Sequence, residues 1–174
     1  MKYWFIIIIK AVLFICSFTF VGCERVDNDS ILRIHIRANS NSDSDQEIKL
    51  SVRDELVKYI RDTIEGLDSC SDVKSRLSSE ILNIESVADK VLESSGYSYV
   101  SKASIRREYF PTRSYDGVSF PAGYYDALII ELGEGVGDNW WCVAYPPLCF
   151  VGENTQGDGF KYRSKLIELI KKYF

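Results

Sequence analysis

The clearest pattern of apolar and polar positions lies in the sequence ILRIHIR at residues 31–37. Apolar side chains there alternate with Arg33, His35 and Arg37, and this two-residue period is that of a β-strand with one buried face. We therefore predict a strand whose apolar side faces the core and whose basic side faces outward.

Two helices are predicted to follow this strand. The sequence SDQE at 44–47 has the form of a capping box and places acidic residues in the first helical turn. Apolar residues recur at helical spacing over 48–64, and Gly66 is placed to end that helix. A second apolar stripe predicts a helix over 72–95, which Gly96 ends.

The second half of the chain has the residue types of strands. Aromatic and β-branched residues are frequent in three segments, 97–110, 124–132 and 139–150, and the glycine-rich segment 133–137 joins the last two. A short helix is expected at 161–174. This order predicts an α+β fold, in which an antiparallel sheet has two long helices packed on one face and a short C-terminal helix.

Residues 1–22 are almost wholly apolar apart from two lysines, and acidic residues appear only after them. This asymmetry predicts export of the remainder, with 1–22 as a signal peptide or an N-terminal anchor. Simple cleavage, retention as an anchor and lipidation at Cys23, the end of a lipobox-like FVGC sequence, are open alternatives. Residues 23–30 are then a tether, and residues 31–174 form a single globular domain.

Charge and residue usage argue against several classes of function. The formal net charge of −4 provides no basic surface for nucleic acid. His35 is the only histidine, no nucleophile-elbow sequence is present, and no residues have the spacing of a metal site. The segment 133–137 lacks the spacing of a phosphate-binding loop and leads into a strand. We therefore expect no enzyme, no cofactor and no metal.

Cys142 and Cys149 flank the pair Pro146-Pro147. Cysteines of an exported protein are expected to be oxidised, so we predict a disulfide between these two. Such a bond would hold the proline-containing bend closed, at a gain of roughly 2–3 kcal/mol in the chain-entropy description.

Trp140 and Trp141 directly precede the first of these cysteines. Neighbouring residues of a strand point to opposite faces, so one ring is predicted in the core and the other outside. An exposed tryptophan beside a cross-linked turn is a suitable anchor for a protein partner. The same ring could also stack on a sugar.

Three blocks of the sequence together resemble one protein family. They are LRIHIRANSNSDSDQEIKLSVRD (32–54), YFPTRSY (109–115) and FPAGYYDALIIELGEGVGDNWWCVAYPPLCF (120–150). Taken in this order, they are similar to the stage II sporulation protein R family. The N-W-W-C-V and P-P-L-C elements of the last block are the most specific part of the resemblance.

The resemblance implies a secreted signalling protein of endospore-forming bacteria. Such a protein is made in the forespore and exported into the space between the two septal membranes. There it is needed to activate a membrane-embedded aspartic protease of the mother cell, which removes the pro-sequence of a sigma factor. The signal is not itself the protease. Membrane association through the N-terminal segment is an additional open alternative.

The matching blocks also supply candidates for the surface that contacts the protease. The alternative function is that of an extracytoplasmic lipoprotein that binds cell-wall glycan through exposed aromatic side chains. The expected partner-binding residues are His35, Asn39, Asp45, Gln46, Arg53, Asp54, Asn139, Trp140, Trp141, Pro146 and Pro147.

Overall fold

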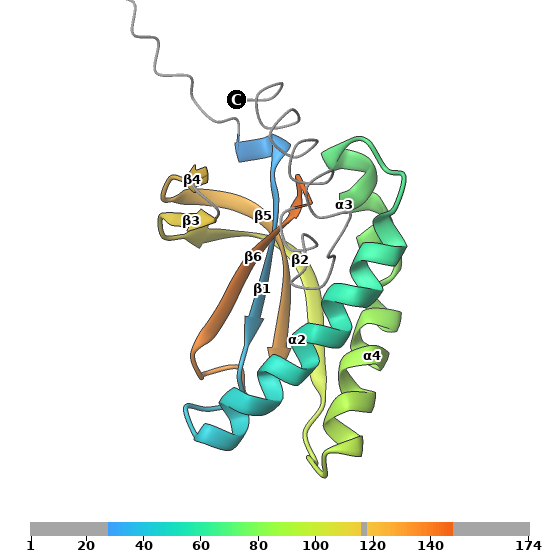
Figure 1. Ribbon diagram of the computed structural model, residues 1–174, viewed down its shortest axis with the longest axis vertical. Coiled ribbons are helices and arrows are strands. Elements are labelled where there is room, and N and C mark those ends of the chain that lie inside the picture. The colour runs from blue at the N-terminus through green and yellow to red at the C-terminus, as the bar shows by residue number, and fades with distance from the viewer. Residues whose placement is uncertain (1–27, 116–117, 148–174) are drawn as a thin grey trace, which may run out of the picture.

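The computed structural model of this chain describes residues 28–115 and 118–147. In that part of the chain, three α-helices lie against one face of a four-stranded sheet (Figure 1). None of the helices found there is both long and apolar enough to cross a membrane. The α-helices are α2 (Asp43–Ile64), α3 (Cys70–Ser79) and α4 (Ile81–Ser94). A short 3-10 helix, η1 (Asn28–Ser30), precedes the first strand.

The sheet has the strand order β2-β5-β1-β6, and β3 pairs with β4 in a separate two-stranded sheet. β5 is antiparallel to β2, β6 is antiparallel to β1, and the central pair β1–β5 is parallel. The predicted α+β class is thus confirmed, with one parallel pair in a mainly antiparallel sheet. The strands are β1 (Leu32–Arg37), β2 (Ser101–Phe110), β3 (Arg113–Tyr115), β4 (Val118–Phe120), β5 (Gly123–Leu132) and β6 (Asn139–Tyr145).

The parallel pair follows from the path of the helices. The chain leaves β1 at one end of the sheet, runs back along α2 and returns along α4 (Figure 1). β2 therefore starts near the end where β1 finishes and runs antiparallel to it. β5 then reverses direction once more, so it lies parallel to β1 when it inserts between β1 and β2.

Serine side chains set the helix boundaries. Ser42, two residues before the predicted cap, caps α2 by accepting a hydrogen bond at 3.2 Å from the N–H of Asp45. Ser69 caps α3 in the same way. The helix predicted over 72–95 is divided at Glu80, directly after Ser79, whose hydroxyl donates to a main-chain carbonyl. Such bonds compete with helical ones and favour a break.

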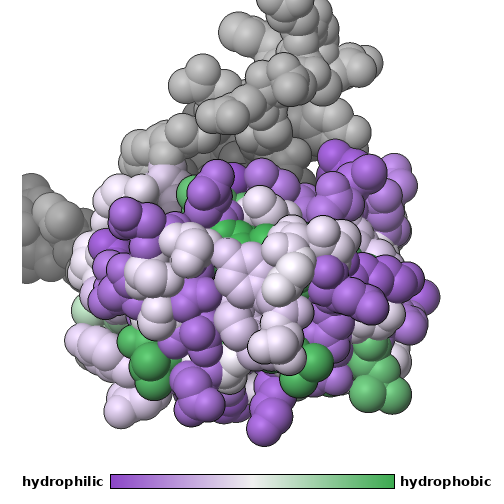
Figure 2. Space-filling view, turned by 90° about the horizontal axis from the view of Figure 1, so that it is seen from below, coloured by the Kyte–Doolittle hydropathy of each residue, from purple (hydrophilic) through white to green (hydrophobic). Residues whose placement is uncertain are grey.

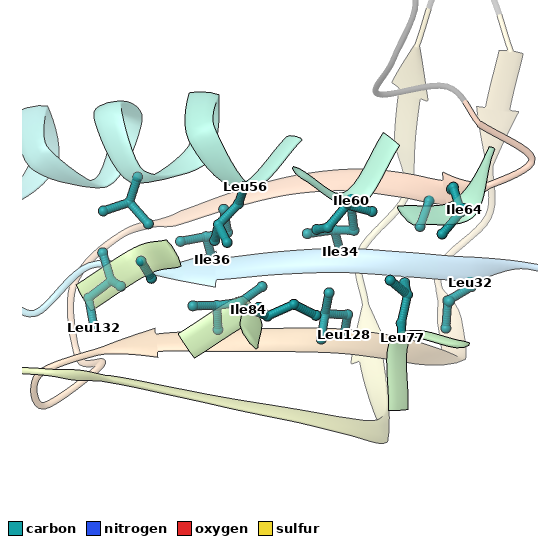
Figure 3. Packing of buried hydrophobic residues seen from close by; sticks show 14 of the residues in the cluster. Leu32, Ile34, Ile36, Leu56, Ile60, Ile64, Leu77, Ile84, Leu128 and Leu132 are labelled. Atoms are coloured by element: carbon teal, nitrogen blue, oxygen red, sulfur yellow. The ribbon is translucent and has the colours of Figure 1, made fainter. Parts of the chain in front are cut away.

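The main core lies between the sheet and the helices, where β1 and β5 face α2, α3 and α4 (Figure 3). The apolar stripe predicted on α2 and the apolar side of β1 both point into it. Side chains in this core include Leu32, Ile34, Ile36, Leu56, Ile60, Ile64, Leu77, Ile84, Leu128 and Leu132.

The prediction of a basic, outward-facing side on β1 is wrong. Arg33 and His35 are 0% and 1% exposed, because a second core covers the opposite face of the sheet. The rings of Phe110 on β2 and Trp141 on β6 lie 4.8 Å apart, although two strands separate β2 from β6 in the sheet. The end of β2 must therefore bend across this face. The other members of the second core are Ile31, Phe120, Tyr125, Ala127, Ile129 and Val143.

Several expectations concern parts of the chain outside the described residues. They are the leader 1–22 with its alternatives, Cys23 and most of the tether, Cys149, and the C-terminal helix at 161–174. These remain predictions.

Replacing Leu56 with Ala tests the main core. Leu56 is fully buried, so the truncation should lower the free energy of unfolding by about 2–5 kcal/mol, through lost burial and a residual cavity. Urea unfolding followed by circular dichroism measures this. The control is Leu82→Ala on α4, where the side chain is 79% exposed and the change should stay within about 0.5 kcal/mol. Equal losses in both variants would contradict this assignment of the core.

Candidate functional site

Two loops meet at one end of the sheet, and both belong to sequence blocks that carry the family resemblance. We use the name paired loops for two segments: 38–46, which is the loop after β1 with the first turn of α2, and 133–139, which is the β5–β6 loop with the first residue of β6. The N–H of Gly137 donates to the carbonyl of Ala38 at 2.9 Å. A Cβ at Gly137 would lie 2.2 Å from the carbonyl oxygen of Ser40, so only glycine allows the two backbones to approach this closely.

Asp45 is the anchor of the first loop. It is 6% exposed and accepts hydrogen bonds from Asn39 Nδ2 at 2.9 Å, Ser40 Oγ at 2.6 Å and Tyr99 Oη at 2.7 Å. Burial raises the pKa of Asp45, but these bonds and that from Ser42 outweigh it and hold the pKa below the usual value. The predicted contact residues Asn39 and Asp45 therefore shape the loop from within.

Gln46 and Lys49 connect this anchor to the second loop. Gln46 Nε2 donates to the carbonyl of Ser40 at 2.8 Å, and its Oε1 accepts from Lys49 Nζ at 2.6 Å. Lys49 Nζ also donates to the carbonyl of Asp138 at 2.9 Å. Lys49 is only 5% exposed, and burial lowers its pKa, although the nearby charge of Asp138 opposes this.

Lys49, which lies in the first family-like block, and Tyr99 are structural residues that are not among the expected partner-binding residues. A signal was present for Lys49, because residues 45 and 49 are four apart on a helix and must share a face. No comparable signal existed for Tyr99, which reaches Asp45 from a segment 54 residues later.

The outer surface of the paired loops is polar, with one apolar side chain at its tip. Val136 is 75% exposed. Figure 2 looks onto this end of the molecule and shows hydrophilic and neutral side chains with a few separated hydrophobic ones. The exposed polar residues of the paired loops include Asn41, Glu134, Asp138 and Asn139.

Trp140 and Trp141 point to opposite faces of the sheet, as predicted, but neither is fully exposed. Trp140 packs against the main core, and the guanidinium carbon of Arg53 lies 5.8 Å from its ring centre. Trp141 stacks on His35 at 3.9 Å, and Arg113 lies 5.7 Å from its ring centre. The prediction of one freely exposed ring is wrong, because the second core and the β3–β4 hairpin cover that face.

The remaining candidates do not join the paired loops. β6 runs from Asn139 to Tyr145, about 20 Å at strand spacing, so Pro146 and Pro147 lie beyond its far end. Pro146 is buried. Cys142 takes part in a disulfide, while the expected partner Cys149 lies outside the described residues. The predicted surface is therefore split between two ends of the strand.

Arg53 and Asp54 lie on α2. Arg53 Nε donates to Asp54 Oδ1 at 2.8 Å, and the side chain of Asp54 is 64% exposed. Their charges therefore largely compensate each other at the surface. Of the two, Arg53 also contacts Trp140, at the start of β6.

His35 is a buried, neutral core residue. Burial lowers its pKa to about 4; Asn139 opposes this shift, and the charges of Arg37 and Arg106 add to it. Its Nδ1 lies 3.8 Å from Oε2 of Glu108. At 1% exposure, His35 cannot touch a partner unless the second core opens.

Next to His35, two arginines and two glutamates neutralise one another. Arg37 pairs with Glu108 and, at 2.7 Å, with Glu131, which Arg106 also reaches at 3.0 Å. Burial raises the pKa of Glu131, but the two arginines outweigh it and lower that pKa overall. Within the ranges that the structure describes, no three His, Cys, Asp or Glu side chains are grouped to hold a metal ion.

The buried neutral His35 predicts an acid-sensitive fold. Its pKa is lowered from 6.5 to about 4, so between these pH values the unfolded state binds the proton and the folded state does not. The free energy of unfolding should fall by up to about 1.4 kcal/mol per pH unit as the pH drops through this window, about 3 kcal/mol in all. Urea unfolding at a series of pH values measures this dependence.

The matched variant is His35→Phe, which keeps a ring against Trp141 but cannot be protonated. Asp45 and Glu131 titrate in both proteins, so the difference between the two curves isolates His35. A variant whose stability falls as steeply as that of the parent between pH 6.5 and pH 4 would contradict the burial of a neutral histidine.

Sequence comparison with known proteins identifies the same family as the matching blocks. The model of the family described as stage II sporulation protein R matches residues 28–155. The stage II sporulation protein R of Bacillus subtilis (strain 168) is 37% identical over 133 residues, which are 76% of this chain and 59% of that protein. The chain thus spans about three fifths of the length of this relative. No solved structure matches the chain.

The matched region contains every described helix and strand, both cores and the paired loops. Because it covers well over half of the 174 residues, the chain belongs to the stage II sporulation protein R family.

Proposed function

We propose that this chain is an exported sporulation signal that activates a membrane-embedded aspartic protease of the mother cell in trans. The protease would then remove the pro-sequence of the sigma-factor precursor. In this proposal the chain acts in the space between the septal membranes and is not itself an enzyme. Family membership and the apolar N-terminal segment 1–22 support it.

The position of the family-like sequence blocks in the fold indicates which surface would bind the protease. The first and last family-like blocks, 32–54 and 120–150, contribute the two paired loops, which the fold brings together at one end of the sheet. The bonds that join them come from the backbone, from the buried side chain of Lys49 and from Asn39 and Asn41, so outer side chains such as Val136, Glu134 and Asn139 are left to face a partner. We therefore assign the protease-binding surface to the paired loops.

The paired loops suit this role because they are ordered before binding. Asn41 Oδ1 accepts from the N–H of Asp138 at 2.6 Å, and Asn39 Oδ1 accepts from the N–H of Glu134 at 2.9 Å. A surface held in this way loses little conformational entropy when a partner docks. Activation then requires only that the surface binds the active state of the protease more tightly than the inactive state.

The proposal also assigns different roles to the candidate residues. Asp45 and Gln46 act by shaping the paired loops, while Asn139 lies on the outer surface and is available for direct contact. Trp140 and Arg53 border this surface on the helix side. His35 acts through the second core, where it supports Trp141.

A charge placed at the tip of the paired loops should block signalling without harming the fold. We would co-express the chain with the protease and the sigma-factor precursor in a non-sporulating host, and follow precursor cleavage by immunoblot. Val136→Asp should lower the rate of cleavage about tenfold or more, since it introduces a desolvation cost at the contact.

The matched control is Leu82→Asp, because Leu82 is equally apolar and 79% exposed but lies on α4, away from the paired loops. A version that lacks residues 1–22 tests whether export is needed. Normal cleavage with Val136→Asp, or equal loss with both aspartates, would contradict the assignment of this surface. Absence of cleavage with the parent chain, all three proteins being present and folded, would contradict the signalling proposal itself.

A further inference from the structure

The side chain of Arg33 is enclosed by aromatic rings on the second face of the sheet. Its guanidinium carbon lies 4.4 Å from the ring centre of Phe110, 5.1 Å from Tyr125, 5.6 Å from Phe120 and 5.9 Å from Tyr115. We call Arg33 and these four rings the aromatic chamber. Arg33 is 0% exposed and forms no ion pair with a carboxylate of the described residues.

Most of the hydrogen-bonding capacity of this guanidinium is unused. Nη2 donates to the hydroxyl of Tyr115 at 3.1 Å and the Tyr125 hydroxyl interacts with the guanidinium, but among the described residues Nε and Nη1 have no partner within hydrogen-bonding distance. Ring faces stabilise the charge of an arginine, yet they do not replace acceptors for its N–H groups. A buried donor without an acceptor costs about 1–3 kcal/mol, and more when it is charged. In the described part of the chain, two of the three guanidinium nitrogens of Arg33 therefore have no hydrogen-bond acceptor.

A second unsatisfied polar group borders the chamber. His35 follows Arg33 on the same face of β1, and both contact the ring of Phe110. Although His35 is 1% exposed, its ring nitrogens have no partner within hydrogen-bonding distance among the described residues, and the Asn139 side chain interacts with the ring only weakly. The glutamate nearest to it, Glu108, is already paired with Arg37. Buried polar atoms of this kind are available to bond a water, an ion or a ligand.

We propose that the aromatic chamber binds the carboxylate of a small organic acid with an apolar body. Arg33 supplies one positive charge, and a monoanion would balance it. A doubly charged phosphate would leave excess negative charge among apolar rings, at a high desolvation cost. The rings of the chamber would in turn cover the apolar part of the acid.

The covering elements favour a small ligand over a macromolecule. The β3–β4 hairpin contributes Tyr115 and Phe120 and closes the chamber from solvent. It pairs only with itself, as a two-stranded sheet with three residues in each strand, and such hairpins are marginally stable alone. Displacement of this hairpin would admit a small acid, which the hairpin then encloses.

The single histidine of the chain provides a specific readout. In the full-length chain in detergent, the imidazole nitrogens of His35 give one set of signals in a long-range ¹H–¹⁵N spectrum. Titration with phenylacetate should shift these signals and saturate. Phenylacetamide has nearly the same shape without the charge and should bind about tenfold more weakly or worse, since bonds to a charged group would be lost. Titrations with acetate and with chloride test whether a negative charge without an apolar body is enough for binding.

Arg33→Met should weaken phenylacetate binding about tenfold or more while the far-ultraviolet circular dichroism is retained, because an apolar side chain can replace an uncompensated buried charge. The control is Arg61→Met on α2, where an exposed arginine pairs with its neighbour and binding should not change. If Arg33→Met fails to fold, the comparison of phenylacetate with phenylacetamide in the parent chain still tests whether the carboxylate is needed for binding.

Three results would overturn the proposal. They are no saturable shift with phenylacetate, equal binding of the acid and the amide, and equal binding of chloride and phenylacetate. The first would mean that water alone satisfies Arg33. This assay needs no protease, so its outcome is separate from that of the signalling experiment.

Discussion

The burial of β1 on both faces is the constraint on which the rest of the structure depends. Its apolar side packs against the helices, and its basic side lies under the second core. Polar side chains on a strand of this kind must find partners inside the protein. Arg37 finds two glutamates, and Arg33 finds aromatic rings and one hydroxyl. The polar properties of the second face therefore depend on how many hydrogen-bond and charge partners each of these buried side chains has.

The two ends of the sheet are consequently built in different ways. At one end, Asp45 and Lys49 are buried and bonded, and they hold two loops in a fixed arrangement. At the other end, a small hairpin covers Arg33, which is only partly satisfied. The first end offers a rigid outer surface, and the second an enclosed interior with unmet bonding capacity. We associate partner recognition with the former and ligand binding with the latter.

Periodicity along the chain predicted most elements and the α+β class, because it reports which side of each element is apolar. It could not report what covers the polar side. The alternation at 31–37 is real, yet Arg33 and His35 are buried by the end of β2 and by β4, which are distant in sequence. Trp141 is covered for the same reason. The paired loops illustrate the same limit, since the bond between Asn41 and Asp138 joins residues 97 apart.

The arrangement of strands around β1 also determines when the domain can fold. Arg37 and Glu131 are separated by 94 residues, and β5 and β6 are the last of the described strands along the chain. Contacts of such large sequence separation form late, because a long loop must close first. A chain with this topology cannot complete its sheet until β6 has been made, so under the proposed export it would still be unfolded while it passes through a translocation channel.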